Sequence, residues 1–277
     1  MALMVARGRL AGGAAMRILM MSLGLVLAGC MPLDEAGNDC ESAQDPQRVL
    51  DSCNAVLAAA PEENAAVAWV FTNRGWAYRE LGEPARAIAD YSRSIALNPD
   101  RPNAHYARGR AHQQVQAWSA AIADHERAIE INPTFVDAWV SLGVAHFELR
   151  QFEDALAATD RAIEIDPEEP VAYNNRGLTY RNLGQLRRAI EDYDRALALE
   201  PDYHNARVGR GVAYQLLGEA DRALADWNRA IEGGDADDVI EWQEFLQREG
   251  LYSGPISGEF DAATRAAVAA CAADPEC

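Results

Sequence analysis

The sequence has few basic residues for its length. Its 277 residues include 25 Lys and Arg but 43 Asp and Glu, which gives a formal net charge of −18 at pH 7. Such a surplus of acid repels the phosphates of nucleic acids and the headgroups of anionic lipids, so neither is expected as a ligand. It also disfavours broad electrostatic attraction to the polyanionic polymers of a cell wall.

Recognisable catalytic motifs are also missing. The chain has no His-Glu-x-x-His segment, no phosphate-binding loop, no nucleophile elbow and no Rossmann glycine set. We therefore expect no enzyme, no cofactor and no metal site. A hydrolase that uses paired carboxylates ranks last among the alternatives, because the pattern brings no such pair to a cleft.

Cysteine is scarce and absent from the middle of the chain. Besides Cys30, there are Cys40, Cys53, Cys271 and Cys277. An even number in an exported chain indicates disulfides, and four cysteines allow three pairings. The local pairs Cys40–Cys53 and Cys271–Cys277 are favoured, because the two pairs lie at opposite ends of the chain. A metal site is the weaker interpretation, since no Cys-x-x-Cys spacing occurs.

The apolar run near the N-terminus, Ile18 to Leu27, is too short to span a bilayer but suits a signal-peptide core. It ends in Leu-Ala-Gly-Cys30, which resembles a bacterial lipobox. The resemblance implies that residues 1–29 are removed and that Cys30 carries a lipid. Met31, which is not Asp, then favours an outer-membrane lipoprotein facing the periplasm. A plain secretory signal with a chance cysteine is the alternative, and the true start is Met1 or Met16.

One 34-residue pattern fills the middle of the chain five times. The copies begin at Ala68, Pro102, Val136, Pro170 and His204. Every copy has Gly at its eighth place, Ala at its twentieth, and Ala or Ser at its twenty-seventh, so two helices can approach closely. Large residues at places four, eleven and twenty-four fill the surrounding space. Pro at place thirty-two ends the second helix in four of the copies.

The pattern resembles the tetratricopeptide repeat, a helix–turn–helix unit. The resemblance implies an all-α superhelical solenoid over residues 68–235, with a concave binding groove. Four histidines occupy places where other copies carry aromatic rings, so we expect them to pack rather than bind metal; they are His105, His112, His125 and His146.

Places seven and twenty-three vary together. They hold Arg and Asp in four copies, and in the third copy both change, to Leu142 and Ala158. A partly buried arginine without its carboxylate would be costly. The covariation therefore predicts an ion pair between the two helices of a repeat; the four pairs are Arg74–Asp90, Arg108–Asp124, Arg176–Asp192 and Arg210–Asp226.

Both ends of the chain depart from the repeat. Residues 30–39 are predicted to be a lipidated tether and residues 40–67 an N-terminal cap, with one helix over 45–60 that ends at Pro61. Residues 236–277 resemble the first part of a peptidoglycan-binding-like domain, in the Leu-Gln-x-x-Gly-Leu-Tyr-Ser-Gly-Pro-Ile-x-Gly-x-Phe string that starts at Leu246. The resemblance implies possible wall contacts at Tyr252, Ile256 and Phe260. The alternative is a fold relic that caps the solenoid.

In the tetratricopeptide family, places two, five, nine, twelve and thirteen of each first helix face the groove. The resemblance places these groove residues here: Trp76, Arg79, Tyr106, Arg110, Val144, Phe147, Asn174, Leu178 and Arg181. Exposed aromatics beside arginine are typical of protein-binding hot spots, so a peptide or an apolar helix face is the expected ligand. For Trp69 and Trp76 the alternative is packing against the N-terminal cap.

Together these features predict a non-catalytic adaptor or scaffold of the bacterial cell envelope. It would bind an envelope protein or peptide in the groove and the membrane through Cys30. In the rival hypothesis the C-terminal module binds peptidoglycan and the repeats are a spacer.

Overall fold

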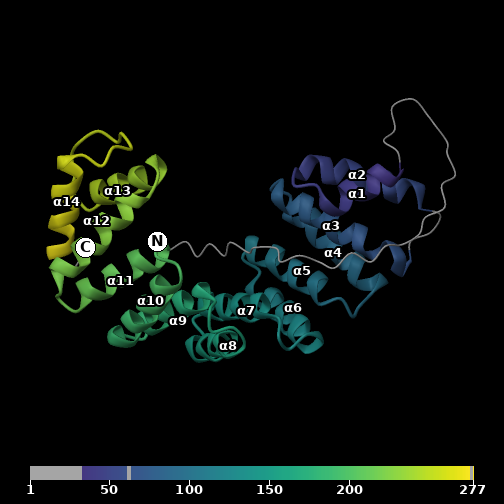
Figure 1. Cartoon of the computed structure of the whole chain (residues 1–277), viewed down its shortest axis with the longest axis horizontal. Helices are drawn as coiled ribbons and strands as arrows, with labels where there is room; N and C mark the ends of the chain where they lie inside the picture. The colour runs from purple at the N-terminus through teal and green to yellow at the C-terminus, as the bar shows by residue number, and fades with distance from the viewer. Residues whose placement is uncertain (1–32, 61–63, 275–276) are drawn as a thin grey trace. The chain divides into compact units, whose positions relative to one another are not determined.

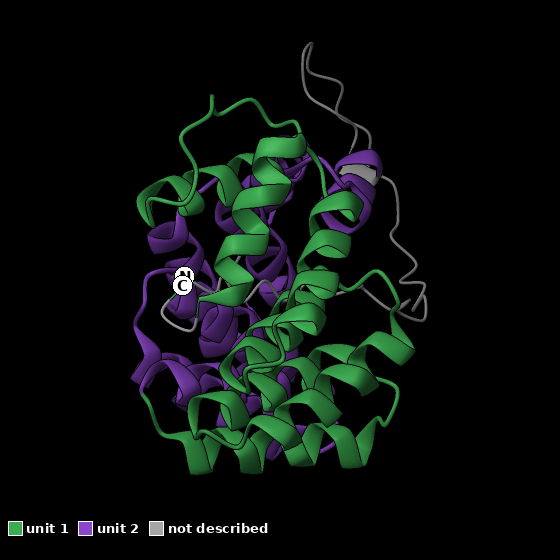
Figure 2. Ribbon diagram, turned by 90° about the vertical axis from the view of Figure 1, so that its left-hand side faces the viewer, with its two compact units in different colours: residues 1–5, 150–277 green, residues 6–149 purple. Residues whose placement is uncertain are grey.

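The computed structural model describes residues 33–60, 64–274 and 277, and these are mostly helical, with no strand among them. The chain folds into two compact units, with the boundary between Leu149 and Arg150. We call them the N-terminal and the C-terminal unit (Figure 2). The predicted all-α fold of tetratricopeptide type is confirmed, since helix–turn–helix pairs follow one another along each unit (Figure 1). Cys30 and the signal segment lie outside the described residues.

The N-terminal unit holds the cap, two complete repeats and the first helix of the third repeat. Its elements are α1 (Leu33–Ser42), α2 (Pro46–Ala59), the short 3-10 helix η1 (Ala65–Val67), α3 (Ala68–Glu80), α4 (Pro84–Leu97), α5 (Pro102–Gln114), α6 (Trp118–Ile131) and α7 (Val136–Glu148). The three first helices begin at the residues where the sequence pattern starts its copies.

Helix α1 corrects the expectation of a tether over residues 30–39. Leu33–Ser42 is helical and packs on α2 and α3. The predicted disulfide Cys40–Cys53 joins α1 to α2, with the two Cα atoms 4.8 Å apart, and Asn73 of α3 donates a hydrogen bond to the Cys40 carbonyl. The cap is therefore a disulfide-linked pair of helices rather than one helix with a flexible leader.

The C-terminal unit holds the second helix of the third repeat, two complete repeats and the module that follows them. Its helices are α8 (Phe152–Ile165), α9 (Pro170–Asn182), α10 (Leu186–Leu199), α11 (His204–Leu216), α12 (Ala220–Gly233), α13 (Ala236–Arg248) and α14 (Ala262–Ala273). The second predicted disulfide, Cys271–Cys277, fastens the end of the chain to α14.

Glycine at the eighth place is required by close packing between the two helices of a repeat. A Cβ added at Gly109 would lie only 2.6 Å from Cε1 of His125, whose ring is fully buried. His125 thus fills the space that a tyrosine or tryptophan ring fills in repeats one, four and five. This agrees with the interpretation of the histidines as packing residues.

The predicted ion pairs are confirmed in all four repeats that carry them. In repeat four, Arg176 donates through Nε to Asp192 Oδ2 at 2.8 Å and through Nη2 to Oδ1 at 2.7 Å. The same two-bond geometry, which we call the Arg–Asp clasp, holds the other three pairs together: Arg74–Asp90, Arg108–Asp124 and Arg210–Asp226. Such paired hydrogen bonds are stronger and more directional than single ones.

Each clasp has a third partner that the sequence pattern did not reveal. The remaining Nη1 of the arginine donates a hydrogen bond to a side chain on the second helix of the preceding repeat, or on the corresponding helix of the cap. Arg176 reaches Asp160 at 2.6 Å, Arg108 reaches Ser92 at 3.0 Å, and Arg74 reaches Asn54 in the cap at 2.8 Å. The clasp therefore also ties a repeat to its predecessor.

Candidate binding face

The first helices of neighbouring repeats lie against one another within each unit. Helix α3 contacts α5 and α5 contacts α7 in the N-terminal unit, and α9 contacts α11 in the C-terminal unit. We call the surface formed by their places two, five, nine, twelve and thirteen the first-helix face. The predicted groove residues all belong to it.

Tyr106 and Arg110 form the centre of this face in the N-terminal unit. Arg110 donates through Nη1 to the Tyr106 hydroxyl at 3.0 Å, and its guanidinium lies 6.0 Å from the ring centroid. The rings of Phe135 and His125 lie 5.0 Å and 5.7 Å from Tyr106. Both Tyr106 and Arg110 stay partly exposed. The result is an aromatic cluster with a cation at its edge, as the sequence predicts for this repeat.

The other predicted groove residues of the N-terminal unit differ in the solvent exposure of their side chains. Trp69 packs against the cap core, and Trp76 does so too, which favours the packing alternative for both. Arg79 is partly exposed and pairs with its neighbour Glu80 at 2.6 Å. Val144 and Phe147 on α7 are also partly exposed.

The first-helix face of the C-terminal unit is more closed. Asn174 and Leu178 are each only 6% exposed, so little of either side chain is available to a ligand. Arg181 remains partly exposed. At the far end, Gln215 donates through Nε2 to the carbonyls of Cys271 at 2.9 Å and Asp274 at 2.7 Å. The C-terminal turn of α14 therefore covers the end of the face.

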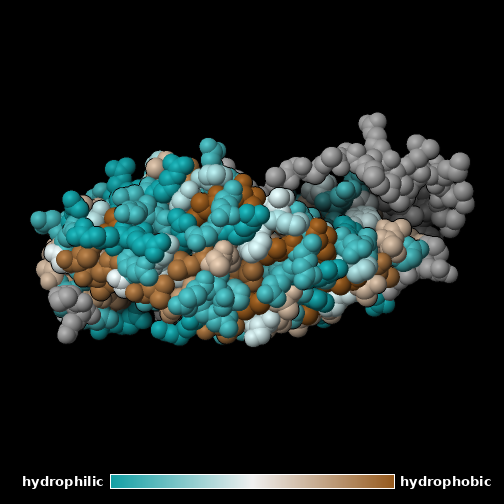
Figure 3. Space-filling model, turned by 90° about the horizontal axis from the view of Figure 1, so that it is seen from below, coloured by the Kyte–Doolittle hydropathy of each residue, from teal (hydrophilic) through white to brown (hydrophobic). Residues whose placement is uncertain are grey.

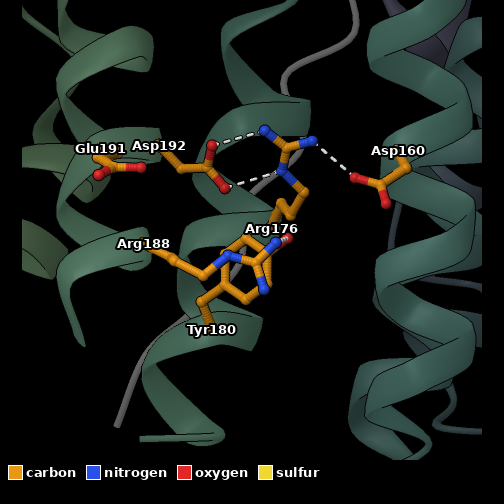
Figure 4. Close-up of a pocket in the computed structure, with 6 residues that line it drawn as sticks. All are labelled: Asp160, Arg176, Tyr180, Arg188, Glu191 and Asp192. Atoms are coloured by element: carbon orange, nitrogen blue, oxygen red, sulfur yellow. Dashed lines mark hydrogen bonds and ion pairs between the residues drawn. The ribbon is translucent and has the colours of Figure 1, made fainter. Parts of the chain in front are cut away.

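A polar pocket of about 300 Å³ lies beside the clasp of repeat four (Figure 4). It is lined by Asp160, Arg176, Tyr180, Arg188, Glu191 and Asp192. Arg188 lies 4.0 Å from the Tyr180 ring centroid and donates to its hydroxyl at 2.6 Å. Arginine also lies over the ring beside the clasp at Tyr78 and Tyr214. Because the arrangement recurs, we assign the pocket to repeat packing rather than to a ligand.

The electrostatics of the clasps point to structure rather than catalysis. The hydrogen bonds from Arg176 to Asp192 raise the pKa of the guanidinium, while burial raises the pKa of the Asp192 carboxyl. In repeat two, burial is the largest single effect on Asp124 and acts to raise its pKa, but His105 and Arg108 together hold that pKa below its usual value. Within the described ranges, no three His, Cys, Asp or Glu side chains are grouped so that they could hold a metal ion.

The C-terminal module is organised around Gln243, which is fully buried. Its Oε1 accepts from the backbone N–H groups of Ser257 and Gly258 at 2.9 and 3.1 Å, and its Nε2 donates to the Glu259 carbonyl and the Thr264 hydroxyl, both at 3.0 Å. One side chain thus fixes the loop between α13 and α14. The sequence pattern does not reveal this role, because glutamine on a helix gives no signal of burial.

The structure corrects one of the three predicted wall contacts. Tyr252 is 4% exposed and donates its hydroxyl to the Pro255 carbonyl at 2.8 Å, so it belongs to the module's core. Phe260 is partly covered by Arg265, whose guanidinium lies 4.2 Å from the ring centroid. Ile256 is 38% exposed and is the only one of the three that presents a large apolar surface.

Family models identify both parts of the chain. The model for the tetratricopeptide repeat matches residues 136–169 and 170–203, and a TPR repeat model matches residues 75–116. The chain therefore contains tetratricopeptide repeats, and we call it a TPR protein in that sense. A model described as a putative peptidoglycan binding domain matches residues 235–271 of this TPR protein.

Solved structures support the fold of the TPR region. One similar structure is the crystal structure of MamA, whose sequence is 26% identical to this one. The match has a TM-score of 0.53 and covers 57% of this chain and 93% of that one. A thermophilic TPR protein of Thermus thermophilus is 25% identical, with a TM-score of 0.53 over 60% and 91%. Pseudomonas aeruginosa pilF, at 16% identity and a TM-score of 0.56 over 66% and 84%, shares the fold alone. A comparison with curated proteins gave no match.

The TPR repeats and the module share one core at the end of the C-terminal unit. Trp227 and Ile231 of α12 pack in the same cluster as Leu246 of α13 and Val268 of α14. The Trp227 and Trp242 rings lie 5.5 Å apart. The module therefore covers the last TPR repeat, as a cap would, and the family match describes a segment that is packed onto the repeats.

Proposed function

We propose that this TPR protein is a non-catalytic adaptor of the bacterial cell envelope, anchored through a lipid on Cys30. It binds a protein or peptide on the first-helix face of its N-terminal unit. TPR repeats support a role in protein–protein interaction. The observation that carries the proposal is the partly exposed Tyr106–Arg110 pair with its neighbouring rings, because rigid aromatics beside arginine supply most of the energy in protein interfaces.

The acidic charge of the chain fits the same role. The chain is strongly acidic, and in the view of Figure 3 hydrophobic residues occur between hydrophilic ones. None of the helices in the described ranges is both long and apolar enough to cross a bilayer. In this proposal the lipid predicted on Cys30 provides the membrane attachment, because an acidic surface would not bind anionic headgroups.

The adaptor role is tested by site-specific photo-crosslinking in the native envelope. A photoreactive residue at Tyr106 should crosslink to a protein partner, and the adduct should be lost when Arg110→Ala is added. The same probe at Arg127, on the exposed side of α6, should give no adduct. Equal adducts from both positions would contradict the proposal.

The lipid anchor is tested by fractionation. The wild-type chain should partition with the outer membrane, and the Cys30→Ser variant should be released into the soluble periplasm. A chain that stays in the membrane fraction after this change would rule out anchoring through Cys30.

A second candidate function is binding to peptidoglycan, which the family match to residues 235–271 favours. Exposed Ile256 in the α13–α14 loop is the best contact residue. Co-sedimentation of the Cys30→Ser protein with purified sacculi should then fall with Ile256→Ser. The matched control Leu81→Ser removes an apolar side chain of similar exposure, 40%, in the N-terminal unit. Sedimentation that is unaffected by Ile256→Ser would make the loop part of a structural cap.

A further inference from the structure

The two disulfides differ in how far another thiol can reach them. Cys40 and Cys53 are 1% and 0% exposed and lie in the core of the cap. Cys271 is also 1% exposed, but its partner Cys277 is only partly buried, where it packs against the module's core. A thiolate must contact a sulfur atom to exchange with a disulfide, so access decides which bond can be reduced. Cys271–Cys277 is therefore open to exchange from the Cys277 side, and Cys40–Cys53 is shielded.

The two bonds also differ in what they hold together. Cys40–Cys53 joins two helices, α1 and α2, that pack on each other and on α3, and it links residues 13 apart in sequence. Cys271–Cys277 links residues only 6 apart, at the end of α14. Since a disulfide that closes a longer loop restricts the unfolded chain more, loss of the first bond should affect the whole cap. Loss of the second should affect only the turn that it closes.

This turn lies at the surface, and the disulfide is its covalent support. The Asp274 N–H donates to the Cys271 carbonyl at 3.1 Å, and the Cys277 N–H donates to the Asp274 carbonyl at 3.2 Å. Ala273 and Asp274 are exposed, so little apolar surface is buried where the helix ends. Segments of this kind open locally while the rest of a protein stays folded.

A single side chain connects this turn to the first-helix face. Gln215 stands at place twelve of the fifth repeat, is 7% exposed, and donates to the same two carbonyls, those of Cys271 and Asp274. In repeat two, Gln113 stands at the same place and donates to the Ser141 carbonyl of α7, the next first helix, at 2.9 Å. In repeat five the turn of α14 is the acceptor instead, and it covers the end of the face.

We propose that Cys271–Cys277 is a redox modification site, with a protein dithiol as its reductant, and that the bond acts as a latch on the end of the first-helix face of the C-terminal unit. A thiolate of the dithiol attacks the Cys277 sulfur and forms a mixed disulfide, and Cys271 leaves as a thiolate that takes up a proton. The second thiol of the reductant then attacks the mixed disulfide and releases the Cys277 thiol. Two electrons and two protons pass to this chain, and the dithiol becomes a disulfide.

Reduction changes what the turn covers. Without the disulfide, the hydrogen bonds of the turn and of Gln215 alone hold it, so the turn separates from α11 and uncovers the end of the face. Oxidation closes it again. The latch goes beyond the adaptor role, because its opening is a property of the purified chain and can be measured without any partner.

The first part of the test reduces the Cys30→Ser protein with increasing dithiothreitol, alkylates the thiols with iodoacetamide, and measures each cysteine by peptide mass spectrometry. Cys271–Cys277 should be half reduced at a dithiothreitol concentration about tenfold lower than Cys40–Cys53, since a buried structural disulfide resists exchange. Equal midpoints for the two bonds, or earlier reduction of Cys40–Cys53, would overturn the proposal.

The second part measures the opening of the turn. Adding Cys277→Ser leaves Cys271 as a buried thiol, which iodoacetamide should modify at a measurable rate without denaturant. Gln215→Ala should raise that rate about tenfold, because it removes the hydrogen bonds that hold the turn on α11. The matched control Gln113→Ala removes the equivalent bond in repeat two and should leave the rate unchanged. A Cys271 thiol that reacts only in urea would show that the turn stays closed without the disulfide and would overturn the latch, as would equal rates with and without Gln215→Ala.

Discussion

Acidification from pH 7 to pH 5 should destabilise the N-terminal unit through His125. The ring is fully buried, and neither of its nitrogens has a hydrogen-bond partner among the described residues. Burial, with a smaller contribution from the positive charge of Arg110, lowers the pKa of His125 to about 3. In the unfolded chain the pKa returns to about 6.5. Protons therefore bind the unfolded state first, and stability falls as the pH drops below about 6.5.

The size of the effect follows from the gap between the two pKa values. At pH 5 the unfolded imidazole is protonated and the folded one is neutral, which removes about 2 kcal/mol of unfolding free energy. The loss grows as the pH approaches 3 and is absent above pH 7. Asp124 opposes the loss slightly, while His112, whose own pKa is also lowered by burial, adds to the effect of Arg110.

Urea unfolding at pH 7, 6 and 5, followed by far-UV circular dichroism, measures this dependence. The His125→Phe variant keeps a ring in the site and should lose about 2 kcal/mol of the pH dependence relative to its parent. The quantity compared is the slope of the unfolding free energy against pH. The packing cost of the new ring is the same at every pH, so it does not affect this slope. His204→Phe, at a partly exposed position on α11, is the matched control. Equal slopes for the parent and His125→Phe would refute the reasoning.

Two further predictions concern packing and turns. Asp192→Ala leaves the Arg176 guanidinium without its main partner and should cost about 3 kcal/mol in urea unfolding. Adding Arg176→Leu, which copies the natural combination of repeat three, should recover most of that loss, and no recovery would contradict the clasp. Gln116 has φ +57°, where repeats one, four and five use glycine. Gln116→Gly should therefore raise stability by about 1 kcal/mol in thermal unfolding, and Gly82→Gln should lower it.

The repeat explains why so much of the fold could be predicted. Five copies in one chain act as an internal comparison, so a residue type that returns at one place reports a shared contact. The comparison predicts the starting residues of the first helices and the Arg–Asp clasps. The disulfides could be predicted by a different argument. The two cysteines of each pair, Cys40–Cys53 and Cys271–Cys277, are close in sequence, and the two pairs lie at opposite ends of the chain.

Features outside the period had no such support. Residues 30–39 are expected from the sequence to be a tether, yet Leu33–Ser42 is a helix that the Cys40 disulfide and the packing on α3 hold in place. The prediction of Tyr252 as a surface contact is wrong, because its side chain is buried in the module. A sequence motif indicates which residue types the module needs, but not which of the side chains point to solvent. The contacts of Gln215 with the end of α14 join residues far apart in sequence, and no local pattern encodes such a contact.

The packing of the C-terminal module decides how its function must be tested. A repeat array needs its last apolar face covered, and here α13 and α14 cover Trp227 and Ile231 of the fifth repeat. Deleting residues 236–277 would therefore expose a repeat core as well as remove a wall-binding loop, and loss of sedimentation could reflect either change. Substitution at Ile256 alters an exposed side chain alone. Capping follows from the shared core, whereas wall binding would have to come from the loop surface.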